Sequence, residues 1–84
     1  MKQEIEDRIK NVIKCCLGEV DIEKINDETN LVDAYGADSI DIVQLVVDLE
    51  YEFSIEFPDE YLLIEKIAPY KELVSTMEEL LSGD

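Results

Sequence analysis

The stretch that decides the fold is Gly36-Ala37-Asp38-Ser39-Ile40-Asp41-Ile42-Val43-Gln44-Leu45-Val46-Val47-Asp48-Leu49-Glu50-Tyr51-Glu52-Phe53. It predicts a loop that runs into a helix, with Ser39 at the junction. Asp38 or Ser39 can provide the N-cap oxygen, and Asp41 in the first turn suits the positive end of the helix dipole. No Pro or Gly interrupts the residues after Ser39, so we expect the helix to continue to Phe53.

The predicted helix carries apolar residues on two sides. At about 100° per residue, one broad arc is expected to face the core and contains Ile42, Leu45, Val46, Leu49 and Phe53. The opposite side contains Ile40, Val47 and Tyr51, with Val43 at its edge. The residues that flank this outer stripe are mostly acidic: Asp41, Gln44, Asp48 and Glu52 on one side and Glu50 on the other. Single exposed apolar residues are common, but a stripe with an acidic rim indicates a docking surface.

The composition predicts one folded domain with an acidic surface. The chain has 84 residues, of which 46% are apolar and 35% charged, so we expect residues 1–84 to form a single domain with one small core. The formal net charge is −15, and no Lys or Arg occurs between Lys24 and Lys66. Such a surface repels nucleic acid and anionic membranes and attracts basic protein surfaces, unless the charge serves solubility alone.

Residue types that support catalysis or metal binding are scarce. The chain has no His, and the adjacent Cys15 and Cys16 have neither a zinc-site nor a redox spacing. We expect both cysteines to pack, Cys16 on the apolar face of its helix and Cys15 at the margin. Two unspaced cysteines without an apolar leader favour a reducing, cytoplasmic setting, and no segment is long enough to span a bilayer. We therefore expect no catalytic residue and no metal, and a monomer.

The segment before the decisive stretch predicts a helix followed by a long loop. Residues 2–17 carry apolar side chains at helical spacing, and Gly18 is placed to end that helix. Residues 19–37 contain too many breaks for a long helix. We expect a loop that its apolar side chains hold against the core, with one short helical turn at residues 22–25.

The segment after the decisive stretch predicts two further helices. Residues 54–58 are expected to be extended, because Pro58 disfavours helical geometry at the residue before it. A short helix should follow at residues 58–66, and an amphipathic helix should run from residue 70 to near residue 83. No segment predicts a strand. The predicted fold class is all-α: a small four-helix bundle, with three longer helices and one short one, and a long loop between the first two helices.

A family resemblance rests on several of these segments. The sequence Gly36-Ala37-Asp38-Ser39-Ile40-Asp41 resembles the Gly-x-Asp-Ser-Leu signature of acyl carrier proteins. Phe57-Pro58-Asp59-Glu60 is similar to the Ile-Pro-Asp-Glu of that family, and Leu31 and the amphipathic ending extend the likeness over nearly the whole chain. The resemblance implies that Ser39, with Asp38 beside it, carries a 4′-phosphopantetheine arm that coenzyme A donates. The arm would hold acyl groups as thioesters.

The resemblance also implies which partners the chain serves. They are a phosphopantetheinyl transferase and acyl-transferring, condensing or acyl-activating enzymes with basic docking surfaces. The residues expected to contact them are Ile40, Asp41, Gln44, Val47, Asp48, Glu50, Tyr51 and Asp59. The protein itself would be no enzyme, because without a histidine or another dedicated base Ser39 is not an activated nucleophile.

Some residues depart from the family pattern. Ile40 replaces the usual Leu, and Gln44 and Tyr51 stand where carriers of bacterial fatty acid synthesis usually have glutamates. The stretch 61–67 is about two residues longer and more apolar than the usual third helix. These departures favour a carrier for a dedicated pathway of fatty acid or related lipid or polyketide biosynthesis over one for bulk fatty acid synthesis.

Three alternatives remain at this point. Aminoacyl, peptidyl and D-alanyl carriers share the fold and the arm, although peptidyl carriers usually have Gly-His-Ser where this chain has Ala37-Asp38-Ser39. An acidic helical adaptor would use Ser39 only to begin the helix. A calcium sensor would use acidic residues near Gly36, but their order and spacing do not match an EF-hand loop.

Overall fold

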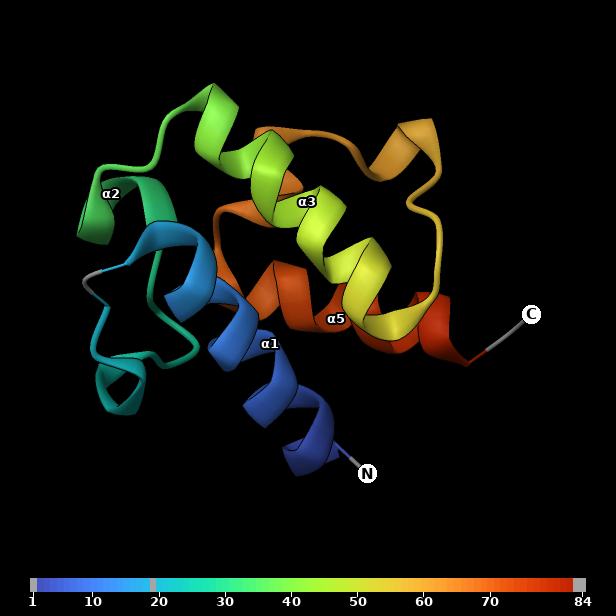
Figure 1. The fold of residues 1–84 in the computed structure, drawn as a ribbon, viewed down its shortest axis with the longest axis horizontal. Helices are drawn as coiled ribbons and strands as arrows, with labels where there is room; N and C mark the ends of the chain where they lie inside the picture. The colour runs from blue at the N-terminus through green and yellow to red at the C-terminus, as the bar shows by residue number, and fades with distance from the viewer. Residues whose placement is uncertain (1, 19, 83–84) are drawn as a thin grey trace.

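The three long helices form where the hydrophobic periodicity predicts them. The computed structural model describes residues 2–18 and 20–82. Its long helices are α1 (Lys2–Leu17), α3 (Ser39–Phe53) and α5 (Tyr70–Leu81) (Figure 1). Gly18 follows α1 in the left-handed region, with φ 87°, and its amide donates to the Lys14 carbonyl at 2.8 Å. A glycine at this position ends a helix without steric cost, as expected.

Four short elements connect the long helices. They are the 3₁₀ turns η1 (Ile22–Lys24) and η2 (Asp59–Tyr61) and the helices α2 (Leu31–Tyr35) and α4 (Ile64–Ile67). No strand occurs in the described residues, and the single isolated bridge joins Asn30 to Pro69. The all-α prediction is confirmed, and η1 lies at the predicted turn. The structure contains two short α-helices, however, where one was expected.

Helix α2 is the first difference from the prediction, which left residues 26–37 without helix. The Asn30 side chain accepts hydrogen bonds from the amides of Val32 (2.9 Å) and Asp33 (3.2 Å) and so begins the helix. Gly36, with φ 69°, ends it. Five residues are too few to show a hydrophobic period, so only the cap residues carry a signal for α2 in the sequence.

The connection after α3 is the second difference, because the predicted helix 58–66 is interrupted. Leu62 has φ −86° and ψ 47°, and Leu63 is extended, so η2 and α4 are separate pieces. Leu62 and Ile67 both line one groove beside α3. The interruption places Leu62 and Ile67 on the side of the groove opposite α3, an arrangement that the local sequence does not reveal.

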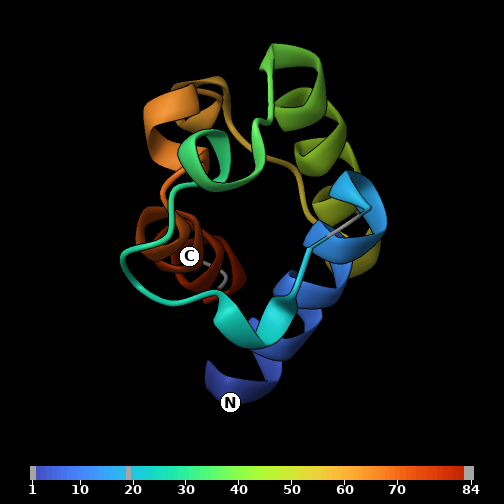
Figure 2. The ribbon, with the colours of Figure 1, turned by 90° about the vertical axis from the view of Figure 1, so that its left-hand side faces the viewer.

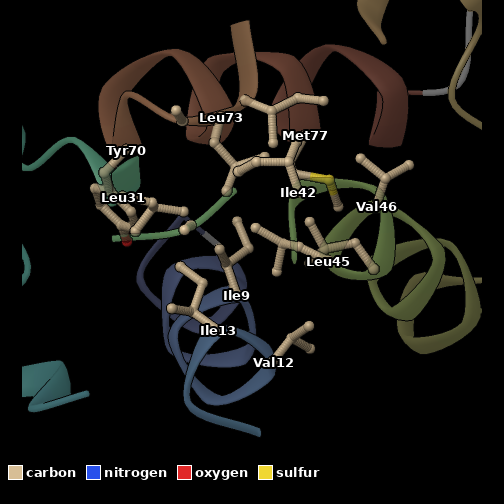
Figure 3. Packing of buried hydrophobic residues seen from close by; sticks show 14 of the residues in the cluster. Ile9, Val12, Ile13, Leu31, Ile42, Leu45, Val46, Tyr70, Leu73 and Met77 are labelled. Atoms are coloured by element: carbon tan, nitrogen blue, oxygen red, sulfur yellow. The ribbon is translucent and has the colours of Figure 1, made fainter. Parts of the chain in front are cut away.

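The core lies between the three long helices. Figure 2 shows α5 facing α1 and α3, and Figure 3 shows apolar side chains of all three pointing toward one another. The largest fully buried side chains are Ile9, Ile13, Leu31, Leu45, Leu49, Ile67, Tyr70, Leu73 and Met77. The predicted inner arc of α3 is confirmed, because Ile42, Leu45, Val46 and Leu49 are buried. Phe53 is half-buried, and the Arg8 guanidinium stacks 4.3 Å from its ring centre.

The two cysteines differ in their surroundings. Cys16 is half-buried, and its Sγ donates to the Asp41 carbonyl at 3.6 Å. Burial raises the pKa of the Cys16 thiol, and the charges of Asp48 and Asp41 raise it further. Cys15 is exposed, so the prediction that it packs is wrong. Its side chain lies beside a surface hollow between α1 and α3, outside the core.

A chain of hydrogen bonds ties the loop before α2 to the start of α5. The Leu31 amide donates to the Ala68 carbonyl and the Tyr70 amide to the Thr29 carbonyl, both at 2.8 Å. Leu31 and Tyr70 are also buried next to each other (Figure 3). None of the helices in the described part of the chain is long and apolar enough to cross a membrane.

Candidate functional site

Ser39 is the first residue of α3, and its side chain is exposed. Asp38 is the N-cap: its carboxylate accepts from the Asp41 amide at 2.9 Å, and the Asp41 carboxylate accepts from the Asp38 amide at 3.3 Å. This reciprocal capping box leaves the Ser39 hydroxyl without a structural task, and it makes no hydrogen bond within the described residues. Of the two possible caps, the structure uses Asp38.

The loop before Ser39 is anchored in the core. Gly36 adopts the left-handed conformation at the end of α2, where a side chain would be strained. Its amide donates to the Val32 carbonyl at 2.9 Å, and the Ala37 amide donates to the Leu31 carbonyl at 3.4 Å. Ala37 is buried, and Ile42 is buried one turn into α3. Ser39 is therefore an exposed residue flanked by a buried residue on each side, Ala37 before it and Ile42 after it.

The outer stripe of α3 faces solvent as predicted. Its four residues are Ile40, Val43, Val47 and Tyr51, and Ile40 is 77% and Tyr51 90% exposed. Asp48 accepts a hydrogen bond from the Gln44 side chain at 2.9 Å. The structure thus gathers the stripe and its polar flank on one helix, while Asp59 is exposed at the start of η2.

Glu50 differs from the other acidic residues of α3. It is half-buried, and its carboxylate accepts a hydrogen bond from the Phe57 amide at 2.8 Å. Its backbone carbonyl also accepts from the amides of Ser54 and Ile55. One residue therefore holds three amides of the segment that follows α3.

An apolar groove of about 200 Å³ lies between α3 and the segment around Leu62. Its lining residues are Ile42, Val43, Val46, Val47, Glu50, Leu62 and Ile67. The lining residues from α3 follow Ser39 by three, four, seven, eight and eleven positions. They therefore lie on the same side of the helix as Ser39, toward its C-terminal end. The groove thus begins one turn from the serine and continues to Glu50.

The helical periodicity of α3 did not predict this groove. It assigned Ile42 and Val46 to the core and Val43 and Val47 to the outer stripe, and the groove lies where the two faces meet. The spacing from Ser39 was a usable signal for the half that α3 supplies. Leu62 and Ile67 form the opposite wall. Their spacing from Ser39 carries no such signal, because they lie outside α3, beyond the turn η2.

Two further hollows lie elsewhere. One, of about 370 Å³, is a hollow at the surface between α1 and α3, beside Arg8 and Cys15. The other, of about 490 Å³, adjoins Glu6 and Tyr70, whose hydroxyl donates to the Glu6 carboxylate at 2.9 Å. Among the described residues, no group of three or more His, Cys, Asp or Glu could hold a metal ion.

The site thus consists of an exposed serine hydroxyl at a helix start and an apolar groove beside the same helix. Residues 7–68 match the family model described as a phosphopantetheine attachment site. An acyl carrier protein of Picosynechococcus sp. is 42% identical over 79 residues, which cover 94% of each chain. An acyl carrier protein of Thermotoga maritima is 40% identical over 80 residues, which cover 95% of each chain.

The chain therefore belongs to the acyl carrier protein family. Its cofactor is phosphopantetheine, and the protein is a carrier and not an enzyme.

Proposed function

We propose that residues 1–84 act as a single carrier domain in which Ser39 is the attachment point for 4′-phosphopantetheine. The observation that carries this proposal is the exposed hydroxyl at a helix start, whose capping is done entirely by Asp38 and Asp41. Because Asp38 is the N-cap, Ser39 in the first helical position is not needed to begin the helix. When bound, the cofactor supplies a thiol that holds acyl groups as thioesters.

The surroundings of Ser39 suit a phosphodiester that must stay mobile. The amides of Ser39 and Ile40 make no hydrogen bond within the described residues, and the helix dipole favours an anion at this end. The carboxylates of Asp38 and Asp41 have the opposite effect, because they repel a negative charge. The balance would keep the phosphate at the surface without fixing the arm.

The groove supports an acyl group as the cargo. An apolar chain gains free energy when it leaves water, and the lining of the groove is apolar apart from Glu50. An amino acid or peptide would leave its charged and hydrogen-bonding groups unpaired there. The groove thus favours an acyl carrier over an aminoacyl, peptidyl or D-alanyl carrier.

The partners that fit are a phosphopantetheinyl transferase and enzymes that transfer, condense or activate acyl groups. The docking surface would be the outer stripe of α3 with Asp41, Gln44 and Asp48 beside it and Asp59 nearby. An apolar stripe among acidic groups suits a basic partner with an apolar centre. We propose fatty acid biosynthesis or a related specialised lipid or polyketide pathway as the setting.

The test is the intact mass of the protein after incubation with coenzyme A and a broad-specificity phosphopantetheinyl transferase. We expect one phosphopantetheine addition to the wild type and none to Ser39→Ala. Ser75→Ala is the matched control, because Ser75 is exposed on α5, and it should be modified like the wild type. A wild-type protein that stays unmodified would contradict the carrier role, and a modified Ser39→Ala would contradict the site.

A further inference from the structure

Glu50 holds the wall of the groove that lies opposite α3. Its carboxylate accepts from the Phe57 amide at 2.8 Å, and the Phe57 side chain is buried in the core. The chain from Phe57 leads through η2 to Leu62, which lines the groove. The distance between this wall and α3 is therefore set near one end by the Glu50–Phe57 hydrogen bond.

Glu50 also closes the groove at the end that is far from Ser39. It follows Ser39 by eleven residues on the same side of α3, which corresponds to about 16 Å along the helix axis. The α3 residues between them that line the groove are all apolar: Ile42, Val43, Val46 and Val47. Among the described residues that line the groove, Glu50 alone is charged. An apolar chain that enters near Ser39 thus meets a carboxylate at the far end.

We propose that Glu50 sets the length of the acyl chain that the groove accommodates. The inference rests on the proposed function, in that the chain is carried on Ser39. A chain that extends past Glu50 must displace the carboxylate from the Phe57 amide. That amide is partly buried, so its lost hydrogen bond is costly, and the carboxylate would lie against hydrocarbon.

The consequence is a limiting acyl-chain length, beyond which a longer chain no longer increases the stability of the protein. Each methylene group that enters the groove shifts the equilibrium between buried and exposed chain roughly fourfold toward the buried state. This gain should continue until the chain reaches Glu50 and then stop. Truncation of the side chain, which removes the acceptor for the Phe57 amide, should move the limit to longer chains, whereas a purely structural role would lower stability equally for every chain.

The experiment uses protein loaded with butyryl, hexanoyl, octanoyl, decanoyl or dodecanoyl groups by the transferase from the acyl coenzyme A. The measurement is Tm as a function of chain length, for the wild type and three variants. In Glu50→Ala, the chain length at which Tm stops rising should increase. Glu50→Gln retains an acceptor oxygen and should keep the wild-type limit. Glu56→Ala is the matched control: Glu56 is exposed on the same segment, makes no hydrogen bond within the described residues, and should also keep that limit.

Hydrogen exchange in the wild type provides a second measurement that needs no variant. The Phe57 amide should exchange slowly in the unloaded protein and with short chains, and faster once the chain exceeds the limit seen in Tm. The proposal is overturned if the limit is the same in Glu50→Ala, or if Phe57 exchange does not depend on chain length. Failure of the transferase to load the protein would instead contradict the proposed function.

Discussion

At the residue scale, Leu49 and Val47 show how sharply α3 separates its two sides. Leu49 is fully buried in the core, whereas Val47 is 49% exposed. The two residues lie two positions apart on the same helix, and both side chains are apolar. The cost of truncating each one therefore reports its environment and not its chemistry.

We predict that Leu49→Ala lowers the free energy of unfolding by about 2–5 kcal/mol, because it leaves a cavity among α1, α3 and α5. Val47→Ala should cost much less, since its side chain is already half in water. Urea unfolding of both variants measures the difference. If Val47→Ala proved the more costly change, the docking stripe would have to be reassigned.

Tyr70 is the residue whose titration should affect stability most clearly. Burial raises its pKa, the hydrogen bond to Glu6 raises it further, and the charges of Glu6, Asp27 and Asp7 act in the same direction. Above a pH of about 10 the unfolded chain loses the phenol proton while the folded chain keeps it. The unfolded state then binds fewer protons, so the free energy of unfolding falls as the pH rises.

We therefore predict a loss of up to about 1.4 kcal/mol per pH unit above that point from Tyr70 alone. Tyr70→Phe should be less stable at neutral pH, because the Glu6 hydrogen bond is gone, but should show a weaker alkaline decline. Urea unfolding over an alkaline pH series measures both effects, with the exposed Tyr51→Phe as control. Equal alkaline slopes in the wild type and Tyr70→Phe would contradict the assignment.

The sequence allowed single residues to be placed where the determining contacts are local. The cap by Asp38 and the exposure of Ile40 follow from positions a few residues apart on one helix. The environment of Glu50 did not follow, because its partner is the amide of Phe57 across a turn. Helical periodicity placed Glu50 at the rim of the stripe, and its expected role in partner binding stays a prediction.

At the element scale, the long helices and the turn η1 were predictable, whereas α2 and the interruption between η2 and α4 were not. Each long helix buries one continuous face, and the sequence shows that face as apolar residues at helical spacing. Helix α2 depends instead on Asn30 and Gly36 as caps, and α4 begins only after the non-helical residues Leu62 and Leu63. The groove, and with it half of the candidate site, depends on these short elements.

For partner docking on helix α3, we make one prediction for the association rate and another for the dissociation rate. Asp48→Lys should slow association with the transferase several-fold at low salt, because long-range attraction acts on the encounter. Ile40→Ala should instead speed dissociation about fivefold, since it removes about 1 kcal/mol of close contact. Surface plasmon resonance over a salt series separates the two rates.

Circular dichroism of both variants must show an intact fold for this comparison to count. Only the effect of Asp48→Lys should fade as the salt concentration rises. If Asp48→Lys left association unchanged at low salt, the acidic flank of α3 would serve solubility. Recognition would then have to be sought at the exposed residues Leu62, Leu63 and Ile64.

At the scale of the whole molecule, the charge of −15 opposes the compact state. In the described residues the single ion pair joins Arg8 to Glu52 at 3.0 Å, so most carboxylates there are not neutralised by neighbours. Added salt should screen this repulsion. The fold should therefore become more stable with ionic strength, in contrast to a protein that depends on surface ion pairs.

We predict that Tm rises from low to physiological sodium chloride, and further with magnesium chloride at matched ionic strength. A gain of about 1 kcal/mol would raise Tm by about 4–8 °C in a domain of this size. Differential scanning calorimetry measures the shift, and an uncharged osmolyte at equal osmolality is the control. A Tm that stays constant or falls across the sodium chloride series would show that self-repulsion contributes little.

The hydrogen bonds between residues 29–31 and 68–70 join the two ends of a long segment and so form a closed loop of chain. Residues 32–67, which contain Ser39 and the groove, leave and re-enter the rest of the fold at the same place. Helices α1 and α5, which lie outside that loop, contact each other directly. Helix α3 within this segment also packs against α1, so the segment and the two helices share one core. A protease that cut the chain once at Leu62 would leave two fragments that stay together, because the hydrogen bonds between residues 29–31 and 68–70 join one fragment to the other.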